Sequence, residues 1–397
     1  MSSPDLTAAE KTAVQQVLDT SYLSIGPQLA AFEEAMSRAS GTRYAVGVNS
    51  GTSGLHLCVI AAGVGRGDLV ITTPFSFIAS ANCILYEGAV PIFVDVDERS
   101  GNIDPDLVAQ AVRDLRQGGA AARRWLPPAL RDRATALDPQ PVKAILPVHA
   151  FGQPADMDPL LAIADAYDLY MIEDACEALG AAYKGRLAGS LGDAAVFAFY
   201  PNKQITTGEG GMIVTDNAAW ADLFRSLRNQ GRDIFDAWLN HTRLGYNYRL
   251  DEMSAALGGV QVARLEELLA KRAQVAAWYN ERLADLASVQ LPRVLPETTR
   301  MSWFVYVVRL EPPVERDVVM AQLAEDGIPS RPYFTPIHLQ PFYGNTFGYA
   351  RGDFPVTEHL GDVSLALPFS SVMSEAEVDY VCAALARTAA LGRKAAA

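Results

Sequence analysis

The spacing of apolar residues along the chain changes near residue 40 and again near residue 250. In the first 40 residues, apolar side chains recur at helical spacing, at Leu6, Val14, Leu18, Ile25, Leu29, Phe32 and Met36. From there to about residue 250, short apolar runs alternate with amphipathic stretches. The runs that predict strands are residues 44–48, 69–72, 90–94, 144–147, 169–173, 194–199 and 212–215. Strands that alternate with helices predict an α/β fold, with a mostly parallel seven-stranded sheet flanked by helices.

The pattern after residue 250 is different. Apolar residues at helical spacing predict one long helix over residues 251–271, through Met253, Leu257, Val260, Leu265 and Leu268. We place a domain boundary at the start of this helix, with a large α/β domain over residues 1–250 and a smaller α+β domain over residues 251–397. The smaller domain is expected to contain a strand over residues 303–310 and helices over residues 316–326 and 375–386.

A lysine and an aspartate follow two of the predicted strands. Pro201 and Asn202 end the strand over residues 194–199, and Lys203 comes directly after them. Asp174 follows the strand over residues 169–173. Open α/β folds bind ligands at the carboxyl ends of their strands, so the two side chains can face one pocket. Pyridoxal 5′-phosphate (PLP) requires this pair, because a lysine attaches it and a carboxylate keeps its pyridine nitrogen protonated. Taken singly, each residue also fits a surface turn or a helix cap.

A small-residue segment after the first strand is a candidate phosphate site. Gly51, Thr52 and Ser53 follow the strand over residues 44–48 and open a helical pattern, where free N–H groups and hydroxyls can hold a phosphate. Ser and Thr also cap helices that bind no ligand. Phe77, which follows the next strand, can stack on a planar ring, whereas core packing is expected for Phe75. Neither a G-x-G-x-x-G motif after the first strand nor a P-loop motif is present.

Three further residues are candidate substrate contacts. Arg249, in the sequence GYNYRL, can pair with a phosphate or with a nearby carboxylate. His149 follows a predicted strand and can approach the pocket, and His338 lies in a turn-rich aromatic segment. A lone histidine is more often a structural residue, so both readings of these histidines stay open.

Composition and charge exclude several classes of function. The chain has 397 residues, of which 50% are hydrophobic and 20% charged, as in globular proteins. A net charge of −13 argues against binding to nucleic acid or anionic membranes. Four widely spaced cysteines predict reduced thiols, with no zinc site and no disulfide framework. The first residues lack a signal-peptide pattern, so we expect a cytoplasmic enzyme. Residues 117–141, rich in arginine and proline, are expected to form a solvated loop or short helix.

Six stretches resemble the DegT/StrS-type sugar aminotransferases, which are PLP enzymes of the aspartate-aminotransferase fold (fold type I). They are NSGTSGL, TPFSFIASAN, PVHAFGQPADMD, IEDACEALG, FYPNKQITTGEGG and GYNYRLDEMSAAL, and they occur in the family's order over about residues 20–270. The combination of K-x-x-T-T-G-E-G-G with E-D-A is highly specific to the family. Two positions differ from the usual pattern. Ala198 replaces a phosphate-binding serine, and Glu177 stands where His or Gln is usual on the second face of the ring.

The resemblance implies roles for particular residues. Lys203 would carry PLP as a Schiff base, Asp174 would pair with the pyridine nitrogen, Thr52 and Ser53 would bind the phosphate, and Phe77 would stack on the ring. Asn247 would reach the phosphate from the neighbouring subunit of a homodimer with shared active sites.

The resemblance also implies a reaction. By a ping-pong mechanism, an amino group would pass from a donor, L-glutamate, to a keto group on a nucleotide-linked deoxysugar. The alternatives are a keto-cyclitol acceptor and a non-catalytic PLP-binding regulator. Deoxysugar dehydration is disfavoured, because that branch of the family replaces the lysine with histidine.

Overall fold

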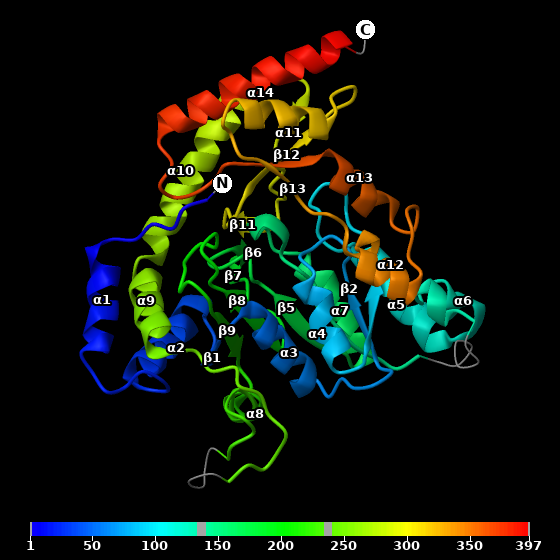
Figure 1. The fold of residues 1–397 in the computed structure, drawn as a ribbon. Coiled ribbons are helices and arrows are strands. Elements are labelled where there is room, and N and C mark those ends of the chain that lie inside the picture. The colour runs from blue at the N-terminus through cyan, green and yellow to red at the C-terminus, as the bar shows by residue number, and fades with distance from the viewer. Residues whose placement is uncertain (1, 133–139, 234–239, 396–397) are drawn as a thin grey trace.

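The computed structural model describes residues 2–132, 140–233 and 240–395, and its centre is a seven-stranded sheet (Figure 1). The strands are β1 (Tyr44–Val48), β2 (Leu69–Thr72), β3 (Val90–Phe93), β4 (Val142–Ile145), β5 (Tyr170–Asp174), β8 (Ala194–Ala198) and β9 (Gly211–Thr215). Their order across the sheet is β1-β9-β8-β5-β4-β2-β3. β9 is antiparallel to both β1 and β8, and the other neighbours are parallel. The mostly parallel seven-stranded sheet predicted from the sequence is confirmed, with strand ends moved by one or two residues.

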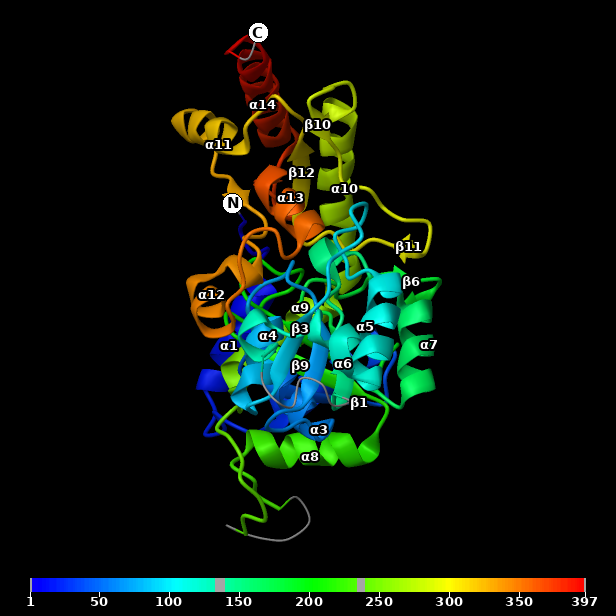
Figure 2. The same ribbon diagram turned by 90° about the vertical axis from the view of Figure 1, so that its right-hand side faces the viewer.

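Helices cover both faces of this sheet. One face packs on α3 (Gly51–Ala61), α4 (Ala79–Tyr86) and α8 (Ala218–Arg228). The other face packs on α2 (Pro27–Ser40), α5 (Pro105–Gln117), α7 (Met157–Tyr167) and α9 (Glu252–Ala263), and α5 and α7 lie side by side (Figure 2). Alternate strand residues face the two layers, so that Val46 packs toward α3 and Ala45 toward α2. Strands buried on both faces account for the continuous apolar runs in the sequence.

The C-terminal part forms a second, smaller layer above the main sheet (Figure 1). Its four-stranded sheet has the order β10 (Val289–Gln290), β12 (Tyr306–Leu310), β14 (Ser364–Leu367) and β13 (Arg331–Pro332). The helices α10 (Leu265–Leu283), α11 (Arg316–Glu325) and α14 (Glu375–Ala395) pack with it. Tyr279 of α10 and Tyr306 of β12 stack at the centre of this apolar cluster, with ring centroids 4.6 Å apart. This arrangement matches the predicted α+β segment.

Several short elements complete the described part of the chain. The helices are α1 (Ala8–Leu18), α6 (Gly119–Arg123), α12 (Pro341–Phe347) and α13 (Pro355–Val363). The 3-10 turns are Pro128–Leu130, Ala150–Gly152 and Ile337–Leu339. The strands β6 (Ala182–Tyr183), β7 (Arg186–Leu187) and β11 (Thr298–Arg300) form a third, three-stranded sheet. The expected loop or short helix at residues 117–141 thus contains α6 and one 3-10 turn, and residues 133–139 of it lie outside the described residues.

The prediction of one helix over residues 251–271 is wrong. The helix is interrupted at Arg264, whose φ of −97° and ψ of 6° separate α9 from α10. The Arg264 side chain binds Asp5 and Glu10, which are more than 250 residues earlier in the chain. The domain boundary placed at residue 251 stays a prediction, and α9 packs against α1 and α2 of the large domain.

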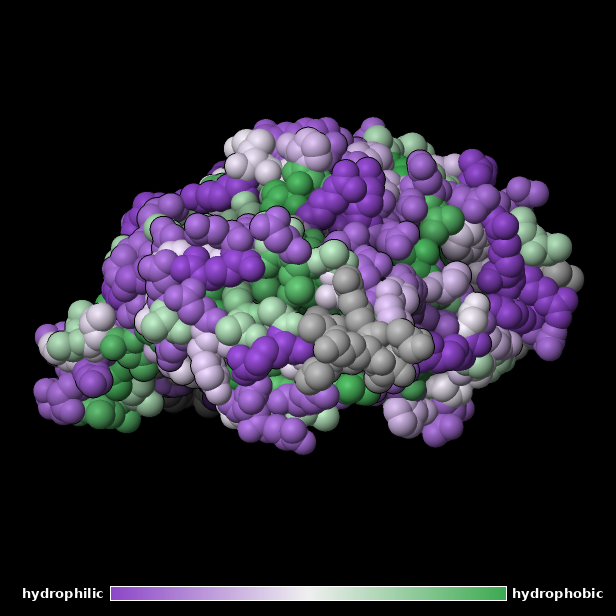
Figure 3. Space-filling model, turned by 90° about the horizontal axis from the view of Figure 1, so that it is seen from above, coloured by the Kyte–Doolittle hydropathy of each residue, from purple (hydrophilic) through white to green (hydrophobic). Residues whose placement is uncertain are grey.

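The surface and the cysteines agree with a globular enzyme. Seen from above, most of the surface is hydrophilic, with apolar residues in separate patches (Figure 3). In residues 2–132, 140–233 and 240–395, no helix is both long and apolar enough to cross a membrane. The four cysteines are not paired with one another, and no metal-ligating cluster is found among the described residues.

Candidate active site

Three strand ends meet at one edge of the main sheet. In the register of the sheet, Val48 lies opposite Gly211, which also pairs with Ala198. Asp174, the last residue of β5, lies beside Val196 of the same β8 strand. The segments after β1, β5 and β8 therefore leave the sheet at the same edge, as the sequence predicted for the phosphate segment, the aspartate and the lysine.

Lys203 lies in the tight turn that follows β8. Its backbone N–H donates to the carbonyl of Tyr200 at 2.9 Å. The side chain is mostly buried, and its Nζ lies 3.7 Å from Oε1 of Glu177 and 4.0 Å from the centre of the Phe304 ring. An ammonium over an aromatic face and beside a carboxylate is attracted by both. The amine is thus contacted by groups from two other segments of the chain.

Asp174 is held in a fixed orientation. The Ser80 hydroxyl donates to its Oδ2 at 2.7 Å, and the backbone N–H of Cys176 donates to its Oδ1 at 3.2 Å. The two donors fix the direction in which the carboxylate points. Ser80 comes from α4, 94 residues earlier in the chain, so packing of α4 on the sheet positions the aspartate.

Glu177 is buried beside Lys203 and is supported by an unusual backbone turn. Its Oε2 accepts a hydrogen bond from the backbone N–H of Phe151 at 2.9 Å. Phe151 has a φ of 61°, in the left-handed region that residues other than glycine rarely adopt. Burial raises the pKa of the Glu177 carboxyl above its usual range, and the nearby Lys203 offsets this only in part.

The start of α3 lies where the sequence predicted a phosphate site, and that role stays a prediction. Ser50 caps the helix, and its side chain accepts from the backbone N–H of Ser53 at 3.0 Å. The first N–H groups of a helix have no intrahelical partner, so those of Gly51 and Thr52 are available to an anion. A Cβ on Gly51 would lie 2.8 Å from Cβ of Ala198 and 2.9 Å from Sγ of Cys176, so only glycine lets the helix start this close to β8.

A cavity of about 430 Å³ joins these groups. Of the residues predicted for the site, Gly51, Thr52, Phe77, Asp174, Glu177 and Lys203 line it. The Ser53 hydroxyl is instead bonded to Oδ1 of Asn49 at 2.6 Å and does not line the cavity. Phe77 is 66% exposed at the cavity, whereas Phe75 is buried in the core, as predicted.

The structure does not bring the two predicted histidines to the cavity. His149 is fully buried, its Nε2 pairs with Oε2 of Glu173 at 2.9 Å, and its Nδ1 accepts from the backbone N–H of Ala155. His338 is also fully buried, with Nε2 at 3.0 Å from Oε1 of Glu358. These pairings correct the expectation of substrate contacts and favour the structural reading of both histidines.

Asn247 and Arg249 lie outside this cavity in the single chain. Arg249 donates to Oδ1 of Asn229 at 3.1 Å, and the neighbouring Tyr248 carbonyl accepts from the backbone N–H of Asn49. The segment is therefore ordered and attached to the residue before the predicted phosphate site. A contact of Asn247 with a neighbouring subunit stays a prediction.

Sequence reasoning missed several residues of the site. Phe304, Tyr333 and Tyr200 line the cavity, and Ser80 orients Asp174. Phe304 lies inside the predicted strand over residues 303–310, and Tyr333 begins the aromatic segment that contains His338. Their aromatic side chains were the available indication in the sequence. Nothing in the sequence indicated the Ser80 contact, because a serine is common inside a helical pattern.

Comparison with known proteins identifies the family. The family model described as the DegT/DnrJ/EryC1/StrS aminotransferase family matches residues 4–386. The chain belongs to this family. It is a PLP-dependent aminotransferase of the fold that the sequence predicted.

Individual relatives match over nearly the whole length. GDP-perosamine synthase of Caulobacter vibrioides is 39% identical over 388 residues, covering 97% of this chain and 96% of that protein. The structure of DesI in the presence of its TDP-sugar product has a TM-score of 0.84 and 31% identity, covering 99% of this chain and 93% of DesI. Spr1654 from Streptococcus pneumoniae, solved in a PLP form, has a TM-score of 0.86 and 25% identity, covering 98% of both chains.

Proposed function

We propose that this aminotransferase moves an amino group from L-glutamate to a keto group of a nucleotide-linked deoxysugar. The observation that carries the proposal is that Lys203 and Asp174 line one cavity, beside the open start of α3. The names of the relatives support a sugar nucleotide as the acceptor, since one is a GDP-perosamine synthase and another was solved with a TDP-sugar.

The residues of the cavity fit PLP. Lys203 would attach it, the oriented carboxylate of Asp174 would pair with its pyridine nitrogen, and Gly51 and Thr52 would hold its phosphate. Because Gly51 has no Cβ to meet Ala198 and Cys176, the start of α3 packs closely on β8 and its first N–H groups lie at the cavity. Phe77 and Glu177 would flank the ring. PLP, when bound, supplies an electron sink for the carbanion left when a proton is removed from the amino donor.

The side chains of this chain then have distinct tasks. Lys203 takes the proton from Cα of the donor and later returns one, acting as general base and then as general acid. Asp174 keeps a positive charge on the pyridine ring. The aromatic walls formed by Phe304 and Tyr333 exclude water from the amine of Lys203. Donor and acceptor use the same cavity in turn, which is a ping-pong order.

The proposal includes a homodimer in which Asn247 reaches the neighbouring subunit's phosphate site. Exposed apolar side chains support it. Tyr200 at the cavity is 54% exposed, Phe77 is 66% exposed, and Leu244, near Asn247 in sequence, is 85% exposed. Large apolar residues left exposed around a cavity are typical of a surface that another chain covers.

The acceptor can be identified with a substrate panel. The enzyme is first loaded with an amino group by L-glutamate, which should release one 2-oxoglutarate per site. GDP-linked and TDP-linked keto-deoxysugars and keto-cyclitols are then added separately, and the return of the original visible absorption is recorded together with the mass of the aminated product. Amination of a keto-sugar nucleotide is expected. Amination of only the cyclitols would show that the acceptor class is wrong, and no 2-oxoglutarate release would show that the donor is wrong.

A further inference from the structure

Arg272 of α10 is buried directly behind the active-site lysine. Its side chain is 2% exposed, and its guanidinium donates to four backbone carbonyls: Lys203 at 2.7 Å, Phe304 at 3.1 Å, and Asn202 and Trp303 at 3.3 Å each. No carboxylate of the described residues forms an ion pair with it. Burial lowers the pKa of Arg272 to about 10, so the side chain is still charged at neutral pH.

The four carbonyls belong to two segments that both reach the cavity. One segment contains Lys203 itself. The other contains Phe304, whose ring centre lies 4.0 Å from the Lys203 Nζ. A planar guanidinium with donors in fixed directions sets the spacing of the groups that it binds. One side chain therefore fixes both the backbone of the lysine and the backbone of the aromatic residue that covers the lysine's amine.

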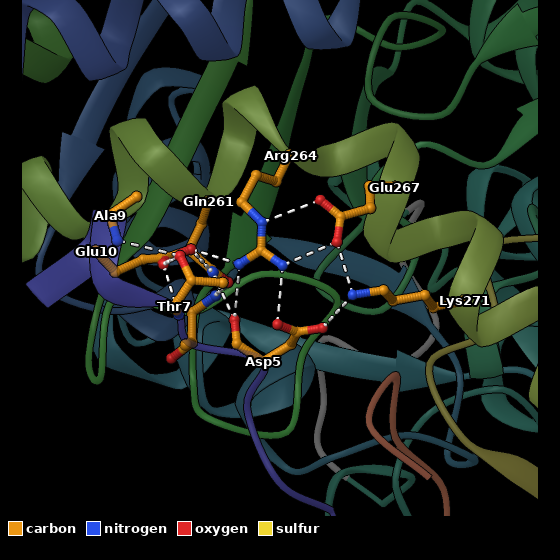
Figure 4. Close-up of polar contacts among 9 residues, drawn as sticks. Asp5, Thr7, Ala9, Glu10, Gln261, Arg264, Glu267 and Lys271 are labelled. Carbon is orange, nitrogen blue, oxygen red and sulfur yellow. Dashed lines mark hydrogen bonds and ion pairs between the residues drawn. The ribbon is translucent and has the colours of Figure 1, made fainter. Parts of the chain in front are cut away.

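A purely stabilising role explains this arrangement poorly. An unpaired buried charge is costly, and the Nε of Arg272 has no hydrogen-bond partner. Arg264, eight residues earlier, shows the contrast (Figure 4). Its guanidinium binds the carboxylates of Asp5, Glu10 and Glu267, and Lys271 also reaches Asp5. Arg264 thus pairs with carboxylates, whereas Arg272 has only neutral partners, namely the four carbonyls and the Phe369 ring, whose centre lies 5.6 Å from its guanidinium carbon.

We propose that Arg272 is a positioning residue for the aminotransferase, which holds Lys203 and Phe304 in register so that the lysine amine meets the cofactor. The inference rests on the proposed attachment of PLP to Lys203. It predicts that loss of the guanidinium weakens cofactor attachment through Lys203 and Phe304, and by more than any accompanying loss of stability explains.

The test compares Arg272→Met with Arg264→Met as a matched control. For each apo-protein, increasing PLP is added, the adduct is fixed with borohydride, and the modified fraction of the Lys203 peptide is measured by mass spectrometry. Thermal unfolding of the same samples gives the loss of stability. We expect apparent PLP affinity to fall at least about tenfold in Arg272→Met and to change less than about threefold in Arg264→Met, although both lose stability. Arg272→Lys keeps a positive charge but loses the planar set of donors. Its apparent PLP affinity should lie between that of Arg272→Met and that of the wild type.

A double-mutant cycle separates positioning from general damage. If Arg272 acts through Phe304, Arg272→Met should lower the PLP affinity less in a Phe304→Leu background than in the wild type. Wild-type affinity in folded Arg272→Met, or an equal loss in Arg264→Met, would overturn the inference. Should Arg272→Met fail to fold, wild-type affinity in Arg272→Lys would overturn it. A wild-type adduct on a lysine other than Lys203 would instead refute the proposed function, and the inference with it.

Discussion

The Nζ of Lys203 lies 3.7 Å from Oε1 of Glu177, and both side chains are largely buried. Burial nevertheless raises the pKa of Glu177, so the attraction of the lysine does not fully offset the cost of taking the carboxylate out of water. A carboxyl whose pKa is higher in the folded than in the unfolded state binds its proton more readily when folded. Its ionised form therefore costs stability at pH values above its unfolded pKa, and this cost disappears at acid pH.

This relationship predicts the effect of Glu177→Gln on the apo-protein. The variant should be more stable than the wild type at pH 8, and the difference should vanish below the unfolded pKa of about 4.3. Denaturant unfolding at pH 4, 6 and 8 measures it. Glu266→Gln, at a 76% exposed carboxylate, is the control and should show little change at any pH. A Glu177→Gln protein that is less stable at pH 8 would mean that the ion pair is net stabilising.

Glu10 has the opposite pH dependence. Burial opposes its ionisation, but hydrogen bonds from Thr7 and Arg264 lower its pKa to about 2. The stability that it contributes should be complete above its unfolded pKa of about 4.3 and lost as the pH falls toward 2. Glu10→Gln should therefore cost roughly 2–3 kcal/mol at pH 7 and almost nothing at pH 2. Glu281→Gln is the exposed control; an equal loss at both pH values would contradict this account.

Asp174→Asn should leave PLP bound but slow turnover at least about 100-fold, because an amide cannot hold the proton on the pyridine nitrogen. Single-turnover rates with L-glutamate measure the chemical step, and the visible spectrum measures occupancy. Ser80→Ala removes only the donor to Oδ2 and should give a smaller loss of rate. Near wild-type turnover in Asp174→Asn would show that another group serves the ring nitrogen.

The sequence predicted most of the sheet and the centre of the site, and the failures have a common physical cause. Strands such as β1 and β5 have local indications, namely apolar runs that end at a polar residue or at glycine. Lys203, Asp174 and Thr52 were found for the same reason, since each follows directly from a strand end. Neither glycine nor proline marks the break at Arg264. Its partner Asp5 is 259 residues away, so the local sequence does not indicate that the helix ends there.

The predictions for the two histidines were wrong for the same reason as the prediction for the helix, namely that the partner residues are distant in sequence. His149 is 24 residues from Glu173, and His338 is 20 residues from Glu358. Nothing near either histidine in sequence shows that a buried carboxylate occupies its Nε2. Arg272 is another example. Its four partners are backbone carbonyls, which every residue type has, so the sequence does not indicate them. Sequence therefore located the groups at strand ends, and only the packed structure shows what holds them.

A shared active site can be tested with mixed dimers. A Lys203→Ala chain and an Asn247→Ala, Arg249→Ala chain should each be impaired alone. In a co-expressed, tag-purified heterodimer, one site would carry both defects and the other neither, so up to about half of the wild-type activity per dimer should return. Because Arg249 contacts Asn229 within its own chain, Asn247→Ala should also be paired separately with Lys203→Ala. No recovery over the parent proteins would show that Asn247 does not serve the neighbouring subunit's site.

The most direct measurement is the location of the cofactor on the chain. The purified, PLP-loaded enzyme is reduced with borohydride and digested, and the peptides that carry the cofactor mass are identified, with Lys184→Ala as a control at a 48% exposed lysine. We predict that the mass lies on Lys203 in the wild type and in Lys184→Ala, and that Lys203→Ala loses the adduct, the yellow colour and turnover together. An adduct on another lysine, or a Lys203→Ala protein that keeps its colour and turnover, would contradict the account.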